Sequence, residues 1–188
     1  RPVLVGAVGD DFGDYRAWLE RHGVDTSGVH ISEVAHTARF VCTTDEDNCQ
    51  IGTFYAGAMA EARNIELAPL VERTGRFGLV LIAPDDPEGM LRHAEECRQR
   101  GWPFAVDPSQ QLARMSGAQA RKLIAGALLL FSNDYELGLL LRKTGWTEQE
   151  VLEQVGLRVT TLGPKGAEIV GADGTALHVG AAKELSKT

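Results

Sequence analysis

The chain has 188 residues, of which 44% are hydrophobic and 24% charged, an ordinary composition for a globular protein. Its formal charge of −7, with no run of Lys or Arg, argues against a nucleic-acid partner, because a phosphate backbone requires a basic surface. There is no stretch of 18 consecutive apolar residues and no recognisable signal peptide, so we expect neither a membrane span nor export.

The cysteines and histidines do not form a metal-binding pattern. Cys42, Cys49 and Cys97 are odd in number and include no Cys-x-x-Cys spacing, which favours reduced thiols and a cytoplasmic protein. The five histidines are scattered, without a His-Glu-x-x-His motif. We therefore do not expect a zinc site.

The first third of the chain predicts a strand, a helix, a second strand and a hairpin. Residues 2–9 are an apolar run ending in glycine, typical of a buried strand, and residues 10–23 predict an amphipathic helix. A short strand is expected at 29–34. Within residues 37–57, two β-rich arms at 38–44 and 49–55 flank the polar tip at 45–48, which predicts an antiparallel hairpin.

From residue 66 onward, helices alternate with apolar strands. The strands are expected at 77–83, 103–107, 127–131 and 157–163, and the helices at 67–74, 87–100, 116–125, 134–143 and 147–155. A closing hairpin turns at Asp173 and Gly174. This alternation predicts one α/β domain over residues 1–188, with an open, mainly parallel sheet, helices on both faces, and the hairpin at 37–57 as an insertion.

The segment Ser-Asn-Asp-Tyr-Glu, residues 132–136, follows one of the predicted sheet strands. Open α/β sheets bind ligands beyond the carboxyl ends of their strands. One interpretation is a helix cap, in which Ser132 or Asn133 pairs with Glu136 in a capping box. The other is a magnesium site, in which Asn133 and Glu136 hold hydrated Mg²⁺ beside phosphates. The two interpretations are compatible, because a helix N-terminus also favours anions.

Two further strands end in segments with the same ambiguity. Thr-Leu-Gly-Pro-Lys-Gly, ending at Gly166, is either a tight turn or a glycine-containing loop whose amides face phosphate. Asp107 ends the other strand, and the residues after it form either a solvated loop or a site for a base or sugar. The side chains expected to project there are Gln110, Gln111 and Arg114.

These segments occur in an order that resembles the ribokinase-like, PfkB-type sugar and nucleoside kinases. The order is VGAVGDDFG, ARF…TFYAGA, DPS, NDYE and VTTLGPKGAEI, and it runs along nearly the whole chain. HTARFVCTTD, GAMAEARNI, DPSQQLAR and VTTLGPKG are most similar to actinobacterial adenosine kinases. The resemblance implies a ribokinase-like fold and ATP-dependent phosphorylation of the adenosine 5′-hydroxyl, with ATP and Mg²⁺ as cofactors.

The resemblance also implies roles for individual residues. Asn133 and Glu136 match the Asn-x-x-Glu motif that organises Mg²⁺ through water and contacts phosphate. The hairpin matches a lid, on which Phe40 and Phe54 would sandwich adenine. The ATP-binding positions are Asn133, Thr161, Gly163 and Gly166. The substrate side is lined by Gln110, Gln111 and Arg114. The resemblance leaves open a monovalent cation such as K⁺ and a homodimer formed through the lid.

The family's Asp-x-x-Gly-x-Gly-Asp motif is not among these 188 residues. That motif carries the catalytic base and the anion hole, so we expect the base beyond Thr188 and a substrate-binding segment before Arg1. The chain as it stands is expected to show no appreciable turnover. Three hypotheses remain: part of an adenosine kinase, a kinase for ribose, fructose phosphate or another nucleoside, and a non-catalytic nucleotide-binding module. Phe40 and Phe54 favour a nucleoside, because a sugar needs no aromatic faces.

Overall fold

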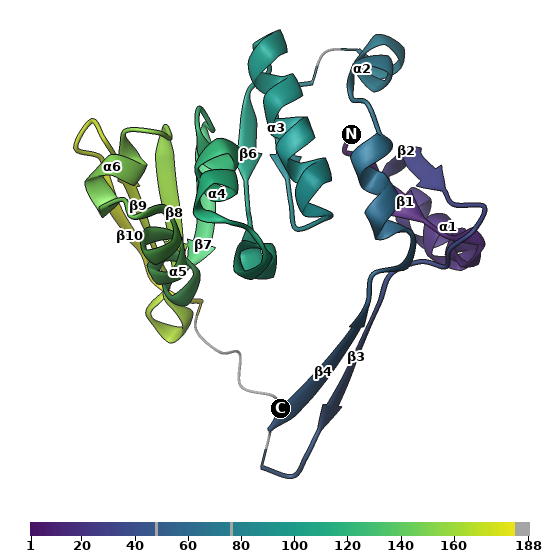
Figure 1. Cartoon of the computed structure of the whole chain (residues 1–188), viewed down its shortest axis with the longest axis horizontal. Helices are drawn as coiled ribbons and strands as arrows, with labels where there is room; N and C mark the ends of the chain where they lie inside the picture. The colour runs from purple at the N-terminus through teal and green to yellow at the C-terminus, as the bar shows by residue number, and fades with distance from the viewer. Residues whose placement is uncertain (48, 76, 183–188) are drawn as a thin grey trace. The chain divides into compact units, whose positions relative to one another are not determined.

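Two units, Arg1–Thr74 and Gly75–Thr188, make up the chain in the computed structural model, which describes residues 1–47, 49–75 and 77–182 (Figure 1). The assignment of both units to one domain stays a prediction. Asn48, the last residue of the predicted hairpin tip, lies outside the described residues.

The first unit is built on a parallel pair of strands, β1 (Val3–Val8) and β2 (Asp25–Ile31). The 3-10 helix η1 (Asp10–Phe12) and helix α1 (Gly13–Arg21) form the crossover that a parallel pair needs. β2 begins four residues before the predicted strand, because its start is set by pairing with β1 and not by the apolar character of its own residues. Val3 is aligned with Asp25, and the Asp25 amide donates to the Pro2 carbonyl over 2.8 Å.

Two further helices complete this unit. Helix α2 (Ala68–Thr74) was predicted, whereas the 3-10 helix η2 (Gly57–Asn64) was not. Ala58 and Ala62 of η2 are fully buried, and η2 packs against β1. Alanine carries too little apolar surface to give a periodic signal, but its small side chain allows this close packing of backbone on backbone.

The predicted hairpin is confirmed, with arms β3 (Arg39–Thr44) and β4 (Gln50–Tyr55). Asp45 begins its tip, where Oδ1 of Asp45 accepts hydrogen bonds from the amides of Asp47 (3.0 Å) and Cys49 (2.8 Å). Every residue of both arms is exposed. The hairpin extends away from β1 and β2 as a two-stranded ribbon (Figure 1).

The second unit contains a six-stranded sheet in the order β10-β9-β8-β7-β6-β5. Its strands are β5 (Val80–Ile82), β6 (Phe104–Val106), β7 (Leu129–Asn133), β8 (Leu157–Thr161), β9 (Ala167–Gly171) and β10 (Ala176–Val179). β5 to β8 are parallel, and β9 and β10 add an antiparallel hairpin. The prediction of a mainly parallel sheet is confirmed, as is the final hairpin, in which Gly174 has φ 89°.

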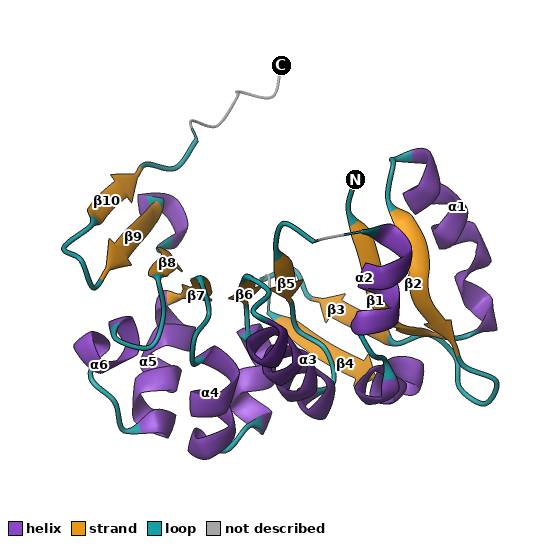
Figure 2. Ribbon diagram, turned by 90° about the horizontal axis from the view of Figure 1, so that it is seen from above, coloured by secondary structure: helices purple, strands orange, loops and turns teal. Residues whose placement is uncertain are grey.

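The helices of this unit lie on one side of the sheet (Figure 2). They are α3 (Pro87–Arg100), α4 (Gly117–Ile124), α5 (Asp134–Thr144) and α6 (Glu148–Leu152). Two short 3-10 helices, η3 (Ser109–Arg114) and η4 (Gly163–Lys165), follow β6 and β8 in the chain. Ile82, Val106 and Leu130 are aligned on neighbouring strands and buried in the core. Helices were expected on both faces, and within residues 77–182 they cover one.

The opposite face of this sheet is apolar and partly open. Leu81 and Leu177 belong to this face by the strand register and are 58% and 60% exposed.

Among the described residues, no helix has the length and apolar character needed to cross a membrane.

The three cysteines should differ sharply in reactivity. Cys42 and Cys49 are exposed on the hairpin, whereas Cys97 is fully buried in α3, and burial raises the pKa of its thiol to about 11. We predict that at pH 8 a thiol reagent labels two cysteines of the folded protein quickly and the third only after denaturation. The double variant Cys42→Ser/Cys49→Ser is the control and should show no fast labelling. Three fast thiols in the folded protein would contradict the burial of Cys97.

Candidate functional site

The carboxyl ends of β6, β7 and β8 bring three polar residues to one edge of the sheet. Asp107 follows β6, Asn133 ends β7, and Thr161 ends β8. Asn133 and Thr161 are direct partners in the parallel ladder, so their side chains lie on the same face of the sheet. This edge is where an open α/β sheet binds its ligand.

Asn133 and Glu136 form the predicted capping box at the start of α5. Asn133 Oδ1 accepts from the Glu136 amide over 2.7 Å, and Glu136 Oε2 accepts from the Asn133 amide over 2.8 Å. The cap therefore uses one oxygen of each side chain. Because Asn133 Nδ2 and Glu136 Oε1 are not part of it, the cap leaves the predicted role beside a hydrated cation open.

Asp107 lies close enough to Glu136 for their charges to interact. Burial raises the pKa of the Asp107 carboxyl, the Glu136 carboxylate raises it further, and a hydrogen bond from the Ser109 backbone opposes both effects. The sequence places Asp107 at a strand end without assigning it a role. Two carboxylates that repel one another at a ligand-binding edge form a suitable environment for a divalent cation.

Asp85, which follows β5, is a second carboxyl that sequence reasoning missed. Burial raises its pKa to about 6, and the neighbouring Asp86 charge adds to the effect, against a hydrogen bond from the Asp86 amide. The available signal for both residues was their position, since Asp107 comes directly after the apolar strand β6 and Asp85 comes three residues after the end of β5. Shifted carboxyl groups gather at functional sites more often than elsewhere.

The three substrate-side residues predicted after β6 lie on η3 but differ in exposure. Gln110 and Arg114 are exposed. Gln111 is 3% exposed, and its Oε1 has no hydrogen-bond partner among the described residues. The end of η3 is held by Lys143 of α5, whose Nζ donates to the carbonyls of Ala113 and Met115 over 2.9 and 2.7 Å. The expectation that all three side chains project from the loop is therefore wrong for Gln111.

The Gly163–Gly166 segment is a tight turn, as one interpretation of the sequence had it. Leu162 donates its amide to the Gly166 carbonyl over 2.7 Å. Gly166 has φ 95°, and a Cβ there would collide with the Val179 carbonyl, so packing within the fold already requires this glycine. Gly163 has φ 57° and open space around its Cα. A contact of either residue or Thr161 with ATP stays a prediction.

Phe40 and Phe54 are brought together on the hairpin of the first unit. They are direct partners in the antiparallel register, so both rings lie on one face of the ribbon. They are 66% and 50% exposed. Gly52, on the same face, makes room for the Phe40 ring, because a Cβ at residue 52 would lie 2.9 Å from Phe40 Cε2. The sequence offered no sign of this contribution of Gly52.

The structural and electrostatic roles of Glu136 can be separated by substitution. Glu136→Gln should keep the capping box, because Gln also accepts at this position, and should leave the free energy of unfolding within about 0.5 kcal/mol. It should also lower the pKa of Asp107, measured by carboxyl NMR, because the repelling charge is gone. Asn133→Ala is the matched control and should cost about 1 kcal/mol in urea unfolding. An unchanged Asp107 pKa in Glu136→Gln would refute the pairing of the two carboxylates.

Known proteins similar to this chain include nucleoside kinases. The chain is 30% identical over 176 residues to the nucleoside kinase of Methanothermobacter thermautotrophicus, covering 92% of this chain and 56% of that protein. The nucleoside kinase of Burkholderia thailandensis, solved in complex with inosine, has a TM-score of 0.84 and 33% identity over 94% of this chain and 57% of the other. The same protein was also solved with ADP-inosine.

The Methanocaldococcus jannaschii nucleoside kinase, described as an archaeal member of the ribokinase family, has a TM-score of 0.82 at 26% identity, over 98% of this chain and 61% of that one. The chain thus spans little more than half the length of the proteins it resembles. Residues 1–186 match the pfkB family carbohydrate kinases. The ribokinase-like fold expected from the sequence is confirmed, and the chain belongs to the pfkB carbohydrate kinase family.

Proposed function

We propose that this chain is part of a nucleoside kinase that transfers the γ-phosphoryl group of ATP to the 5′-hydroxyl of adenosine. The observation that carries the proposal is the pair of exposed rings of Phe40 and Phe54 on one face of the hairpin. Base-aromatic stacking contributes roughly 1–3 kcal/mol per base. A purine nucleoside offers such a face, whereas ribose or fructose phosphate does not.

The hairpin would act as a lid. Closing over the substrate would exclude water, which otherwise competes with the nucleoside as phosphoryl acceptor. The relative from Burkholderia thailandensis was solved with a purine nucleoside and with ADP-inosine, which supports the nucleoside class for this chain without distinguishing adenosine from inosine.

The edge of the sheet in the second unit would hold the phosphates and Mg²⁺. Glu136 and Asp107 would hold a hydrated Mg²⁺ ion, with the Asn133 amide beside it. The Asp107 pKa is raised by burial and, in addition, by repulsion from Glu136, and a cation would relieve this repulsion. When bound, Mg²⁺ supplies positive charge to the phosphates. The N-terminus of α5, together with Thr161 and the Gly163 turn, would offer hydroxyl and amide donors to the phosphate oxygens.

Deprotonation of the 5′-hydroxyl would be the task of an aspartate outside these 188 residues, as the family resemblance implies. We therefore predict no appreciable ADP release from the 188-residue chain. The same chain extended by its natural flanks should release ADP with adenosine in the presence of Mg²⁺, and much less with ribose or fructose 6-phosphate. Inosine, measured in parallel, separates adenosine specificity from a broader purine specificity.

The ADP-release measurements can contradict the proposal in two ways. Turnover by the 188-residue chain would refute the external base. A higher kcat/KM for ribose than for adenosine, in the extended protein, would refute the nucleoside assignment.

The aromatic pair can be tested in the same extended protein. Phe40→Leu and Phe54→Leu keep an apolar side chain but remove the ring, so each should raise the KM for adenosine about tenfold while the KM for ATP changes less than about twofold. Phe54→Tyr is the matched control and should stay near wild type, because it keeps the aromatic face. A KM for adenosine equal to that of wild type in both leucine variants would exclude stacking on these rings.

The other face of the lid would pair two copies of the chain. Val41, Ile51 and Tyr55 share that face by the strand register and are 60%, 74% and 49% exposed. An isolated two-stranded ribbon is marginally stable in water, so a covering surface would stabilise it. We predict a dimer by analytical ultracentrifugation and a monomer for Ile51→Glu, with Thr43→Glu on the same face testing whether charge alone suffices. A monomeric wild type would exclude this pairing.

A further inference from the structure

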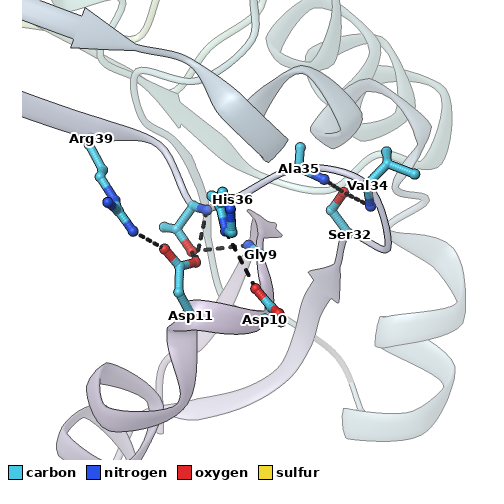
Figure 3. A network of polar contacts seen from close by, with 9 residues as sticks. Gly9, Asp10, Asp11, Ser32, Val34, Ala35, His36 and Arg39 are labelled. Atoms are coloured by element: carbon cyan, nitrogen blue, oxygen red, sulfur yellow. Dashed lines mark hydrogen bonds and ion pairs between the residues drawn. The ribbon is translucent and has the colours of Figure 1, made fainter.

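The first root of the lid, residues 36–39, lies tightly against the end of β1 (Figure 3). A Cβ on Gly9 would lie 2.6 Å from both the Ala35 carbonyl oxygen and the His36 Cα, so only glycine allows this approach. The Gly9 amide donates to Thr37 Oγ1 over 3.0 Å. The backbone entering the lid is thus fixed to the end of a sheet strand.

Asp11, two residues beyond Gly9, collects three hydrogen bonds from the same root. Oδ1 accepts from the Thr37 amide over 2.9 Å and from the Thr37 hydroxyl over 2.6 Å, and Oδ2 accepts from Arg39 Nη2 over 2.5 Å (Figure 3). The hydrogen bonds from Thr37, and then that from Arg39, lower the pKa of Asp11 far below its usual range. The carboxylate is therefore ionised at neutral pH and holds both residues by charge-assisted bonds.

The second root, where η2 follows β4, is tied to the first. The Ala58 amide donates to the His36 carbonyl over 2.9 Å. Ser32 donates to Glu61 Oε1 of η2 over 2.7 Å, and its Oγ accepts from the Ala35 amide over 3.0 Å. Both ends of the lid therefore leave from one hydrogen-bonded block.

Asp10, Asp11 and His36 also lie close enough together to share a cation. Both oxygens of Asp11 already accept bonds from Thr37 and Arg39, and the guanidinium supplies the positive charge that a cation would bring. Asp10 and His36 are exposed at the surface. The hydrogen-bonding pattern therefore assigns Asp11 to the lid root and not to a metal.

We propose that Asp11 is a positioning residue that sets the direction in which the lid leaves the first unit, and thereby the placement of Phe40. This inference rests on the proposed nucleoside kinase function. Arg39 is the first residue of β3 and Phe40 is the second, so a shift of the Arg39 backbone displaces the ring directly. Every residue of the two arms is exposed, which leaves the roots as the structural support of the ribbon within this unit.

Two substitutions weaken the contact without adding bulk. Asp11→Asn removes the charge that holds Arg39, and Thr37→Val removes the hydroxyl while keeping the shape of the side chain. Asp14→Asn is the matched control, because Asp14 is an exposed aspartate in the first turn of α1 and makes the same change in charge. Thr37→Ser keeps the hydroxyl and should restore wild-type behaviour if Thr37→Val has an effect.

The first measurement is hydrogen–deuterium exchange of lid and lid-root peptides, which needs no substrate. We expect exchange at residues 37–44 and 50–55 to rise at least about fivefold in Asp11→Asn and Thr37→Val, and to stay unchanged in Asp14→Asn and Thr37→Ser. The second is steady-state kinetics of the extended protein, in which Asp11→Asn should raise the KM for the nucleoside about tenfold and leave the KM for ATP within about twofold.

The two measurements separate the failure of this inference from that of the proposed function. Exchange in Asp11→Asn equal to that in Asp14→Asn overturns the inference, and so does faster exchange with an unchanged nucleoside KM. If the wild type phosphorylates no nucleoside, the proposed function fails, and the exchange comparison alone then decides whether Asp11 holds the lid.

Discussion

The reciprocal hydrogen bonds between Asn133 and Glu136 are the constraint on which the carboxyl end of β7 and the start of α5 depend. Asn133 is the last residue of β7 and Asp134 is the first of α5, so the chain passes from strand to helix without a loop. Such a junction leaves the first amides of the helix without partners inside the helix, and the capping box satisfies two donors at once. The same two bonds hold the Glu136 side chain back toward the end of the sheet.

This position of Glu136 has an electrostatic cost, because its carboxylate repels that of Asp107. The carboxylate stabilises the helix start, yet it also acts on Asp107 at the end of the neighbouring strand and raises the pKa of that carboxyl. A fold optimised only for stability would not place two carboxyl groups together where one is half-buried. Glu136 thus stabilises the start of the helix and also supplies the charge that the proposed cation site requires, and the repulsion of Asp107 is the cost of this double role.

Local patterns made much of this architecture predictable. Asn133 and Glu136 are three residues apart, which predicts the capping box. The apolar runs of β6 to β8 predict a buried parallel sheet. The prediction failed where distant segments decide the outcome. β2 begins at Asp25 because β1 pairs with it there, and Gln111 is buried because η3 packs against α5. The charge interaction of Asp107 with Glu136 and the hydrogen bonds of Asp11 with Thr37 join segments that no motif links.

The hairpin formed by β3 and β4 shows how much the direction of an exposed ribbon depends on residues outside it. A two-stranded ribbon has little buried surface to fix its direction, so direction must come from its attachment to the rest of the unit. The sequence assigns different tasks to neighbouring positions: Phe40 and Phe54 form an aromatic face, and Gly52 makes room for one ring. Asp11 contacts neither ring, but it holds the residues immediately before Phe40. The predicted binding residues are therefore an incomplete description of the proposed site, because the placement of Phe40 depends on hydrogen bonds at the root of the hairpin that a motif does not contain.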